Sequence, residues 1–136
     1  MISTLPKNLP REDRVNIAVY YSQQKVLPSM AAGVDEALSS KGAALFKRTC
    51  GGCHGQQGQG METMPRLAGQ PGDYIRKALT RFRNNDPARA GSVMMGIASQ
   101  LSEADIEALA AYLSRLQLTS REEQASLARI QQAAAR

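Results

Sequence analysis

Cysteine and histidine are scarce in this sequence. Its 136 residues include two cysteines and one histidine, and all three lie in the run CGGCH at residues 50–54. A structural zinc site takes four ligands, mostly cysteine and histidine, so these three residues are too few for one. A thioredoxin-like pair of cysteines would need a strand followed by a helix, and a plain disulfide would leave the histidine unexplained. The scarcity therefore argues against three common uses of cysteine.

Long apolar runs and aromatic residues are also few. No stretch approaches the roughly 18 consecutive apolar residues of a membrane-spanning helix. The first residues, MISTLPKNLPREDR, lack the apolar segment of a signal peptide. Aromatic residues make up 4% of the chain, whereas alanine, leucine, glutamine and arginine, which favour helix, are abundant. If the protein works outside the cytoplasm, we expect its export signal to have been removed or to lie upstream of Met1.

Acidic residues are outnumbered by basic ones. Seventeen lysines and arginines against twelve aspartates and glutamates give a net charge of +5 and a pI near 9.6. A basic surface attracts acidic proteins, nucleic acids or anionic membranes. The same excess is equally consistent with a generally basic, soluble surface.

Helical patterns cover most of the chain, and no segment shows the alternation of a strand. Helices are expected at about residues 10–23, 35–49, 73–84, 103–116 and from 120 onward. Glycine and proline mark residues 25–33 as a linker and residues 51–72 and 84–92 as loops. The chain is therefore expected to be all-α.

Spacing and capping sequences support three of these helices. Capping boxes are predicted at residues 102–105 and 120–123. Apolar stripes at helical spacing comprise Tyr74, Ala78, Leu79 and Phe82 in one helix and Ile106, Leu109, Ala110, Leu113 and Leu116 in another.

The run CGGCH matches C-x-x-C-H, the signature for covalent attachment of c-type haem. Two thiols must reach two vinyl groups of one macrocycle, and the two intervening residues, expected to be loop, give them that reach. The histidine follows at once and is expected to be the proximal iron ligand. We therefore predict one covalent haem c per chain, attached through Cys50 and Cys53 and ligated by His54.

Further motifs resemble those of class I cytochromes c. Gly42 and Phe46 precede the first cysteine by eight and four residues, as that family's glycine and aromatic residue do. The family's P-x-L-x-G loop is matched at residues 65–69, and its C-terminal L-x-x-Y at Leu109 and Tyr112. The resemblance implies a fold in which the N- and C-terminal helices cross closely at the glycine and loops enclose the haem.

Within that class the chain looks most like the di-haem "c-four" cytochromes. The similarity lies in LAGQ at residues 67–70, FR at residues 82–83 and M-x-x-I-A-x-x-L-S-x-x-D-I from residue 94. It implies that the Pro65 carbonyl accepts a hydrogen bond from His54 Nδ1. Pro65 and Leu67 are both expected to bind the haem. The similarity also implies a bacterial, periplasmic protein.

The second axial ligand is expected to be a methionine. One histidine per chain excludes bis-histidine ligation, and methionine is the next common partner. Of the six methionines, two precede the haem domain and two lie close after His54, in the loop expected on its proximal side. Met94 and Met95 remain. The family pattern, with Ile97 and Ala98 three and four residues later, favours Met94, and Met95 is the alternative.

These expectations predict a single-electron carrier in a respiratory or other redox chain, not an enzyme. Its partners would be donor and acceptor proteins, with acidic docking faces that suit the basic surface, and not nucleic acid. Two alternatives stay open: a five-coordinate haem enzyme or sensor, and a cytochrome domain of a larger redox enzyme.

The N-terminal segment resembles a later part of the chain. Shifting the sequence by 92 residues superposes residues 9–22 on 101–114 with five identities, among them Asp13 on Asp105 and Tyr20 on Tyr112. We therefore predict three parts: a helical arm and linker at 1–34, a haem domain at 35–118 and a helical extension at 119–136. The arm would be the remnant of a preceding cytochrome domain and could mediate association.

Overall fold

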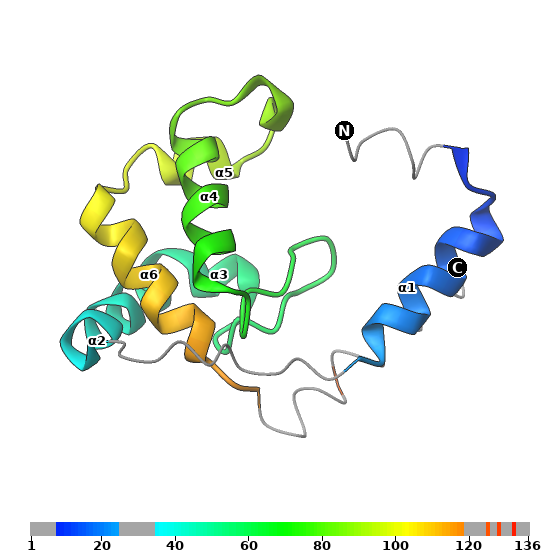
Figure 1. The fold of residues 1–136 in the computed structure, drawn as a ribbon, viewed down its shortest axis with the longest axis horizontal. Helices are drawn as coiled ribbons and strands as arrows, with labels where there is room; N and C mark the ends of the chain where they lie inside the picture. Colours follow the sequence, from blue (N-terminus) through cyan, green and yellow to red (C-terminus); the bar gives the residue numbers. More distant parts are fainter. Residues whose placement is uncertain (1–7, 25–34, 119–124, 126–127, 129–131, 133–136) are drawn as a thin grey trace. The chain divides into compact units, whose positions relative to one another are not determined.

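The computed structural model describes residues 8–24, 35–118, 125, 128 and 132. The chain divides into two compact units, residues 27–118 and residues 1–26 with 119–136. Within the described residues the secondary structure is helical apart from one isolated bridge between Met61 and Met64, as the sequence predicted (Figure 1). The expected linker at 25–33 lies outside the described residues, and so do the capping box at 120–123 and nearly all of the helix after it.

Helix α1 spans Arg11–Ser22, as expected from the proline before it. Pro10 occupies the N-cap position, and no side chain there bonds to the first turn of the helix. No residue of α1 is buried; the side chain of Ile17, for example, is 45% exposed. The helix thus forms without burying an apolar face.

In the larger unit, helix α2 (Glu36–Leu45) begins at Asp35, whose carboxylate accepts hydrogen bonds from the backbone N–H groups of Ala37 and Leu38. A π-helical turn, η2 (Phe46–Cys50), and the short helix α3 (Gly51–His54) continue it. The expectation that loop begins at residue 51 is wrong. The glycines do not break the helix because the Gly51 N–H donates to the Phe46 carbonyl, so the motif lies on a helical turn.

Helix α6 (Glu103–Arg115) crosses α2 at very close range, as the family resemblance implied. A Cβ atom on Gly42 would lie 2.0 Å from the carbonyl oxygen of Ala108 and 2.8 Å from Cβ of Tyr112, so only glycine fits. Phe46 is fully buried beside the crossing, with its ring centroid 5.7 Å from that of Tyr112. The core comprises Leu45, Phe46, Ile75, Ala98, Leu101, Ile106, Leu109, Ala110 and Leu113.

The predicted capping box of α6 is present. The Asp105 N–H donates to Ser102 Oγ at 3.1 Å, and the Ser102 N–H donates to Asp105 Oδ2 at 3.0 Å. Of the predicted apolar stripe, the four helical positions are buried, and Leu116 at the C-cap is half-buried.

Helix α4 (Gly72–Arg83) has the expected length, but its predicted apolar stripe is wrong by one residue. Tyr74 is 51% exposed, whereas Ile75 is 3% exposed. Ile75, with Leu79 and Phe82 four and seven residues later, forms the side that packs on the core. The aromatic ring suggested a core position, but the packing of α4 against α6 decides which side is buried.

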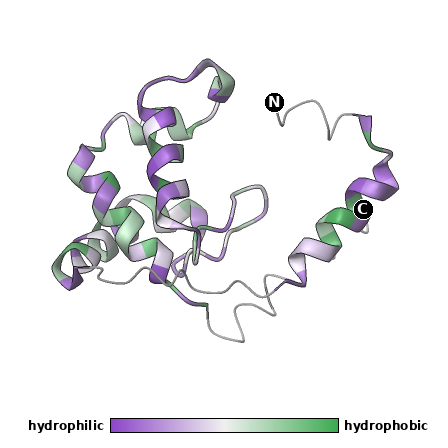
Figure 2. Ribbon diagram, in the orientation of Figure 1, coloured by the Kyte–Doolittle hydropathy of each residue, from purple (hydrophilic) through white to green (hydrophobic). Residues whose placement is uncertain are grey.

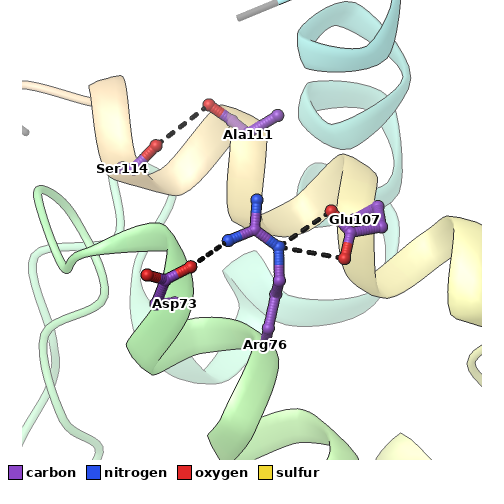
Figure 3. Close-up of polar contacts among 5 residues, drawn as sticks. All are labelled: Asp73, Arg76, Glu107, Ala111 and Ser114. Atoms are coloured by element: carbon purple, nitrogen blue, oxygen red, sulfur yellow. Dashed lines mark hydrogen bonds and ion pairs between the residues drawn. The ribbon is translucent and has the colours of Figure 1, made fainter. Parts of the chain in front are cut away.

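An arginine joins α4 to α6 on the outside of the core (Figure 3). Nε of Arg76 donates to both carboxylate oxygens of Glu107, at 2.9 and 2.8 Å, and an Nη atom donates to Asp73 at 2.6 Å. The single Nε–H is thus shared between the two Glu107 oxygens, and this three-centre hydrogen bond links the two helices. A short 3₁₀ turn, η3 (Pro87–Arg89), and an unexpected helix, α5 (Met94–Ala98), follow α4. No described helix is both long and apolar enough to span a membrane.

Candidate haem site

His54 ends the helical turn that carries the motif, and its ring is buried, with 4% exposure. Nδ1 lies 2.8 Å from the carbonyl oxygen of Pro65, the contact that the family resemblance implied. Because a carbonyl only accepts, Nδ1 carries the proton and Nε2 has a free lone pair. Nε2 is buried without a hydrogen-bond partner. A buried, unpaired imine nitrogen of this kind is the donor that a haem iron takes.

Both cysteines are free thiols on the same helical turn. Cys50 is half-buried and Cys53 is exposed, and their i, i+3 spacing places them on one side of the helix. Burial and the neighbouring Cys53 thiol raise the pKa of Cys50 to about 11, so this thiol is neutral at pH 7. Two thiols on one side of a helical turn, beside one buried imidazole, suit covalent attachment of a haem. Among the described residues, no cluster of three His, Cys, Asp or Glu could hold a bare metal ion.

The loop after the motif returns the chain to His54. Gly55, with a φ of +81°, ends the helix in a conformation that glycine adopts readily. Leu67 and Ala68 donate their N–H groups to the Gly58 carbonyl at 2.8 and 3.0 Å. Leu67 is half-buried and packs against the core. Backbone bonds thus hold the segment that carries Pro65 against the histidine.

Met94 and Met95 lie together in the first turn of α5, and both are half-buried. The Met94 N–H donates to Ser92 Oγ at 3.2 Å, and α5 packs against α4. The sequence analysis missed this five-residue helix, whose N-cap, Val93, forms no side-chain cap bond. The placement of the two methionines does not distinguish them. Met61 and Met64 pair with each other through their backbones in the loop after His54.

A family model for cytochrome c matches residues 39–117, more than half of the chain. Cytochrome c4 of Pseudomonas aeruginosa is 36% identical over 121 residues, which cover 80% of this chain and 59% of that protein. The crystal structure of reduced recombinant cytochrome c4 from Pseudomonas stutzeri superposes with a TM-score of 0.62 at 36% identity, covering 74% of this chain and 58% of that chain. The chain thus spans somewhat more than half the length of these relatives.

A smaller relative is covered almost completely. Cytochrome c-554(547) of Halothiobacillus neapolitanus is 32% identical over 87 residues, which cover 57% of this chain and 96% of that protein. Three features of the structure fit a haem-binding cytochrome. They are the free Nε2 of His54, the two thiols, and the helix crossing at Gly42. The chain belongs to the cytochrome c family, and its cofactor is haem c.

Proposed function

We propose that this protein carries single electrons between redox proteins in a bacterial periplasm. The observation that carries the proposal is the buried Nε2 of His54, which has no partner while Nδ1 is bonded to Pro65. Cys50 and Cys53 would hold haem c through two thioether bonds, His54 would ligate its iron, and Pro65 and Leu67 would line the site. When bound, haem c supplies a one-electron couple.

Met94 is proposed as the second axial ligand, on the pattern with Ile97 and Ala98. With protein ligands at both axial positions, no coordination site is left for a substrate, so the chain would transfer electrons and would not catalyse a reaction at the iron. The Pro65 carbonyl would fix the ring orientation of His54 and raise its basicity, as such second partners do.

Covalent attachment is tested by extraction with acidified acetone. The haem should stay on the polypeptide in the natural protein and become extractable when Cys50 and Cys53 are both replaced by alanine. Free extraction from the natural protein would contradict the thioether assignment.

Axial ligation is tested by the optical spectrum of the oxidised protein. A sulfur–iron bond gives a weak far-red band, which we expect to disappear in Met94→Ala and to persist in Met95→Ala, its matched neighbour. The reverse pattern would assign the ligand to Met95. A band that survives in both variants would exclude both residues.

Two exposed cations next to the motif are proposed to face acidic partners. Lys47 and Arg48 lie on η2, and neither forms an ion pair within the described part of the chain. Most other cations of the haem unit are paired, for example Arg76 with Glu107 and Arg83 with Glu103. Unpaired charge beside the attachment site would raise the association rate and align the partner with the haem.

Charge reversal tests this docking face. Lys47→Glu with Arg48→Glu should slow electron exchange with an acidic redox protein by about tenfold at low ionic strength, and added salt should remove the difference. Lys77→Glu, an exposed site on α4, is the matched control and should change the rate little. Lys77→Glu changes the net charge half as much as the double variant, so a logarithmic rate change half as large would mean that only net charge matters.

The arm at residues 1–34 is proposed to derive from a preceding cytochrome domain. Helix α1 begins at Arg11, which is 92 residues before Glu103, where α6 begins. The match to cytochrome c4 covers 80% of the 136 residues, which is about 109 and longer than the haem domain at 35–118. Deleting residues 1–33 should leave the haem spectrum unchanged, and loss of the far-red band would place the arm within the haem domain.

A further inference from the structure

The Pro65 carbonyl is held by a tight reversal of the chain. His54 and Gly60 are joined by a bond from the Gly60 N–H to the His54 carbonyl at 2.9 Å. Met61 and Met64 then exchange two backbone hydrogen bonds, at 3.1 and 2.7 Å, and close a two-residue turn. The next residue, Pro65, therefore lies opposite Gly60 across this hairpin.

Gly60 is crowded on that side by backbone atoms alone. A Cβ atom on it would lie 2.9 Å from the Met64 carbonyl oxygen, 2.9 Å from the Arg66 nitrogen and 3.2 Å from the carbonyl carbon of Pro65. These atoms belong to the main chain, so no change of rotamer can relieve the contact. The φ angle of Gly60 is +83°, which also disfavours a side chain.

Gly60 is thus connected to both hydrogen bonds of His54, the one at its main-chain carbonyl and the one at its Nδ1. The Gly60 N–H fixes the histidine's main chain, and the surface of Gly60 that lacks a Cβ lets residues 64–66 approach the imidazole. Any side chain at this position therefore forces residues 64–66, and with them the Pro65 carbonyl, to shift.

We propose that Gly60 is a positioning residue for the iron ligand, acting through the Pro65 carbonyl on His54. By keeping the Nδ1–H···O bond at 2.8 Å, it maintains the basicity of the imidazole and so keeps the reduction potential low. This inference rests on the proposed function, because it assigns a role around the same histidine.

Two glycine variants of the haem protein test it. Gly60→Ala should raise the reduction potential and make the His54 Nδ1 proton exchange with solvent at least tenfold faster in the NMR spectrum. Gly91→Ala is the matched control, since Gly91 has nearly the same φ, +82°, but no atom within 4 Å of the added Cβ. It should leave both readouts unchanged. If Gly60→Ala also leaves them unchanged, the proposal is wrong.

Pro65→Ala separates the carbonyl from the ring. The variant loses the proline ring but keeps the carbonyl oxygen that accepts from His54 Nδ1, so the reduction potential should change much less than in Gly60→Ala. A shift as large as that of Gly60→Ala would show that the proline ring, and not Gly60, positions the carbonyl.

Hydrogen exchange in the natural haem protein provides a measurement that does not depend on a folded variant. The Gly60 N–H and the His54 Nδ1–H should become exposed in the same opening, with the same dependence on denaturant. Different dependences would overturn the coupling. The absence of covalent haem from both the natural protein and Gly91→Ala would instead contradict the proposed function.

Discussion

Helices α1 and α6 carry related sequences in opposite environments. Their first residues, Arg11 and Glu103, are 92 residues apart, which is the offset of the sequence repeat. In that alignment Ile17 corresponds to Leu109. Leu109 is 1% exposed, whereas Ile17 is 45% exposed. Hydrophobic residues are visible on both helices in Figure 2. A similar pattern thus produces a core helix in one unit and a helix without any buried residue in the other.

The comparison shows what an apolar pattern needs before it stabilises a fold. Helix α6 packs against α2 and α4 and is tied to α4 by Arg76. Its first turn is closed by the Ser102–Asp105 box, whereas the N-cap of α1 is Pro10, which has neither an N–H nor a hydroxyl to form one. Burial comes from a complementary partner surface and not from the helix itself.

The largest expected effect comes from removing the partner surface of α6. Gly42→Ala forces a Cβ onto the backbone of Ala108, and we expect it to lower the free energy of unfolding by about 3 kcal/mol or more. Gly52→Ala, a helical glycine with no atom within 4 Å of the added Cβ, should change it by less than about 0.5 kcal/mol. Denaturation of both haem proteins in guanidinium chloride measures the difference; similar midpoints would contradict the close crossing.

Much of this arrangement could be predicted from the sequence. Gly42, Phe46 and Tyr112 identified the crossing, and C-x-x-C-H with Pro65 identified the contact around His54. The resemblance to class I cytochromes c implied both features, because these residues match that family's motifs. The helical state of the motif was missed because glycines usually interrupt helices, whereas here Gly51 and Gly52 lie in the short helix α3, directly after the π-helical turn η2.

Other features depend on packing that no local pattern records. Tyr74 and Ile75 are adjacent apolar residues, and only the placement of α4 on α6 decides that Ile75 is buried. The crowding at Gly60 likewise depends on residues 64–66 folding back over it. The assignment of Met94 over Met95 rests on the family pattern and stays a prediction.

The second prediction compares equivalent positions of the two helices. Leu109→Ala should destabilise the haem unit by about 2–5 kcal/mol because it leaves a cavity in the core. Ile17→Ala should change the free energy of unfolding by less than about 0.5 kcal/mol because its side chain is largely in solvent. Thermal unfolding followed by the haem spectrum would show both. A large effect of Ile17→Ala would mean that α1 packs against another surface.

The third prediction concerns the two N-caps. Ser102→Ala should cost about 1 kcal/mol, since the Asp105 N–H loses its side-chain acceptor. Pro10→Ser would give α1 the cap that it lacks, and we expect a small gain in far-UV helix signal without a change in the unfolding midpoint of the haem unit. A raised midpoint would show that α1 and the haem unit unfold together.

The smallest expected effect is the pH dependence of the capping box. Hydrogen bonds from Ser102 and Lys41 lower the pKa of Asp105 below its ordinary value, so its carboxylate stabilises the fold above the unfolded pKa of about 3.9. This contribution is lost as the pH falls through the lower, folded pKa. Asp105→Asn should therefore lower the melting temperature slightly at pH 7 and by less at pH 2.

The equivalent change in α1 is the control for this effect. Asp13 takes the place of Asp105 in the repeat, but Pro10 stands where Ser102 would be, so no box can form. Asp13→Asn should leave the melting temperature unchanged at both pH values. If the two variants lower it equally at pH 7, the effect comes from negative charge near a helix N-terminus, and the reciprocal hydrogen bonds of the box contribute nothing measurable.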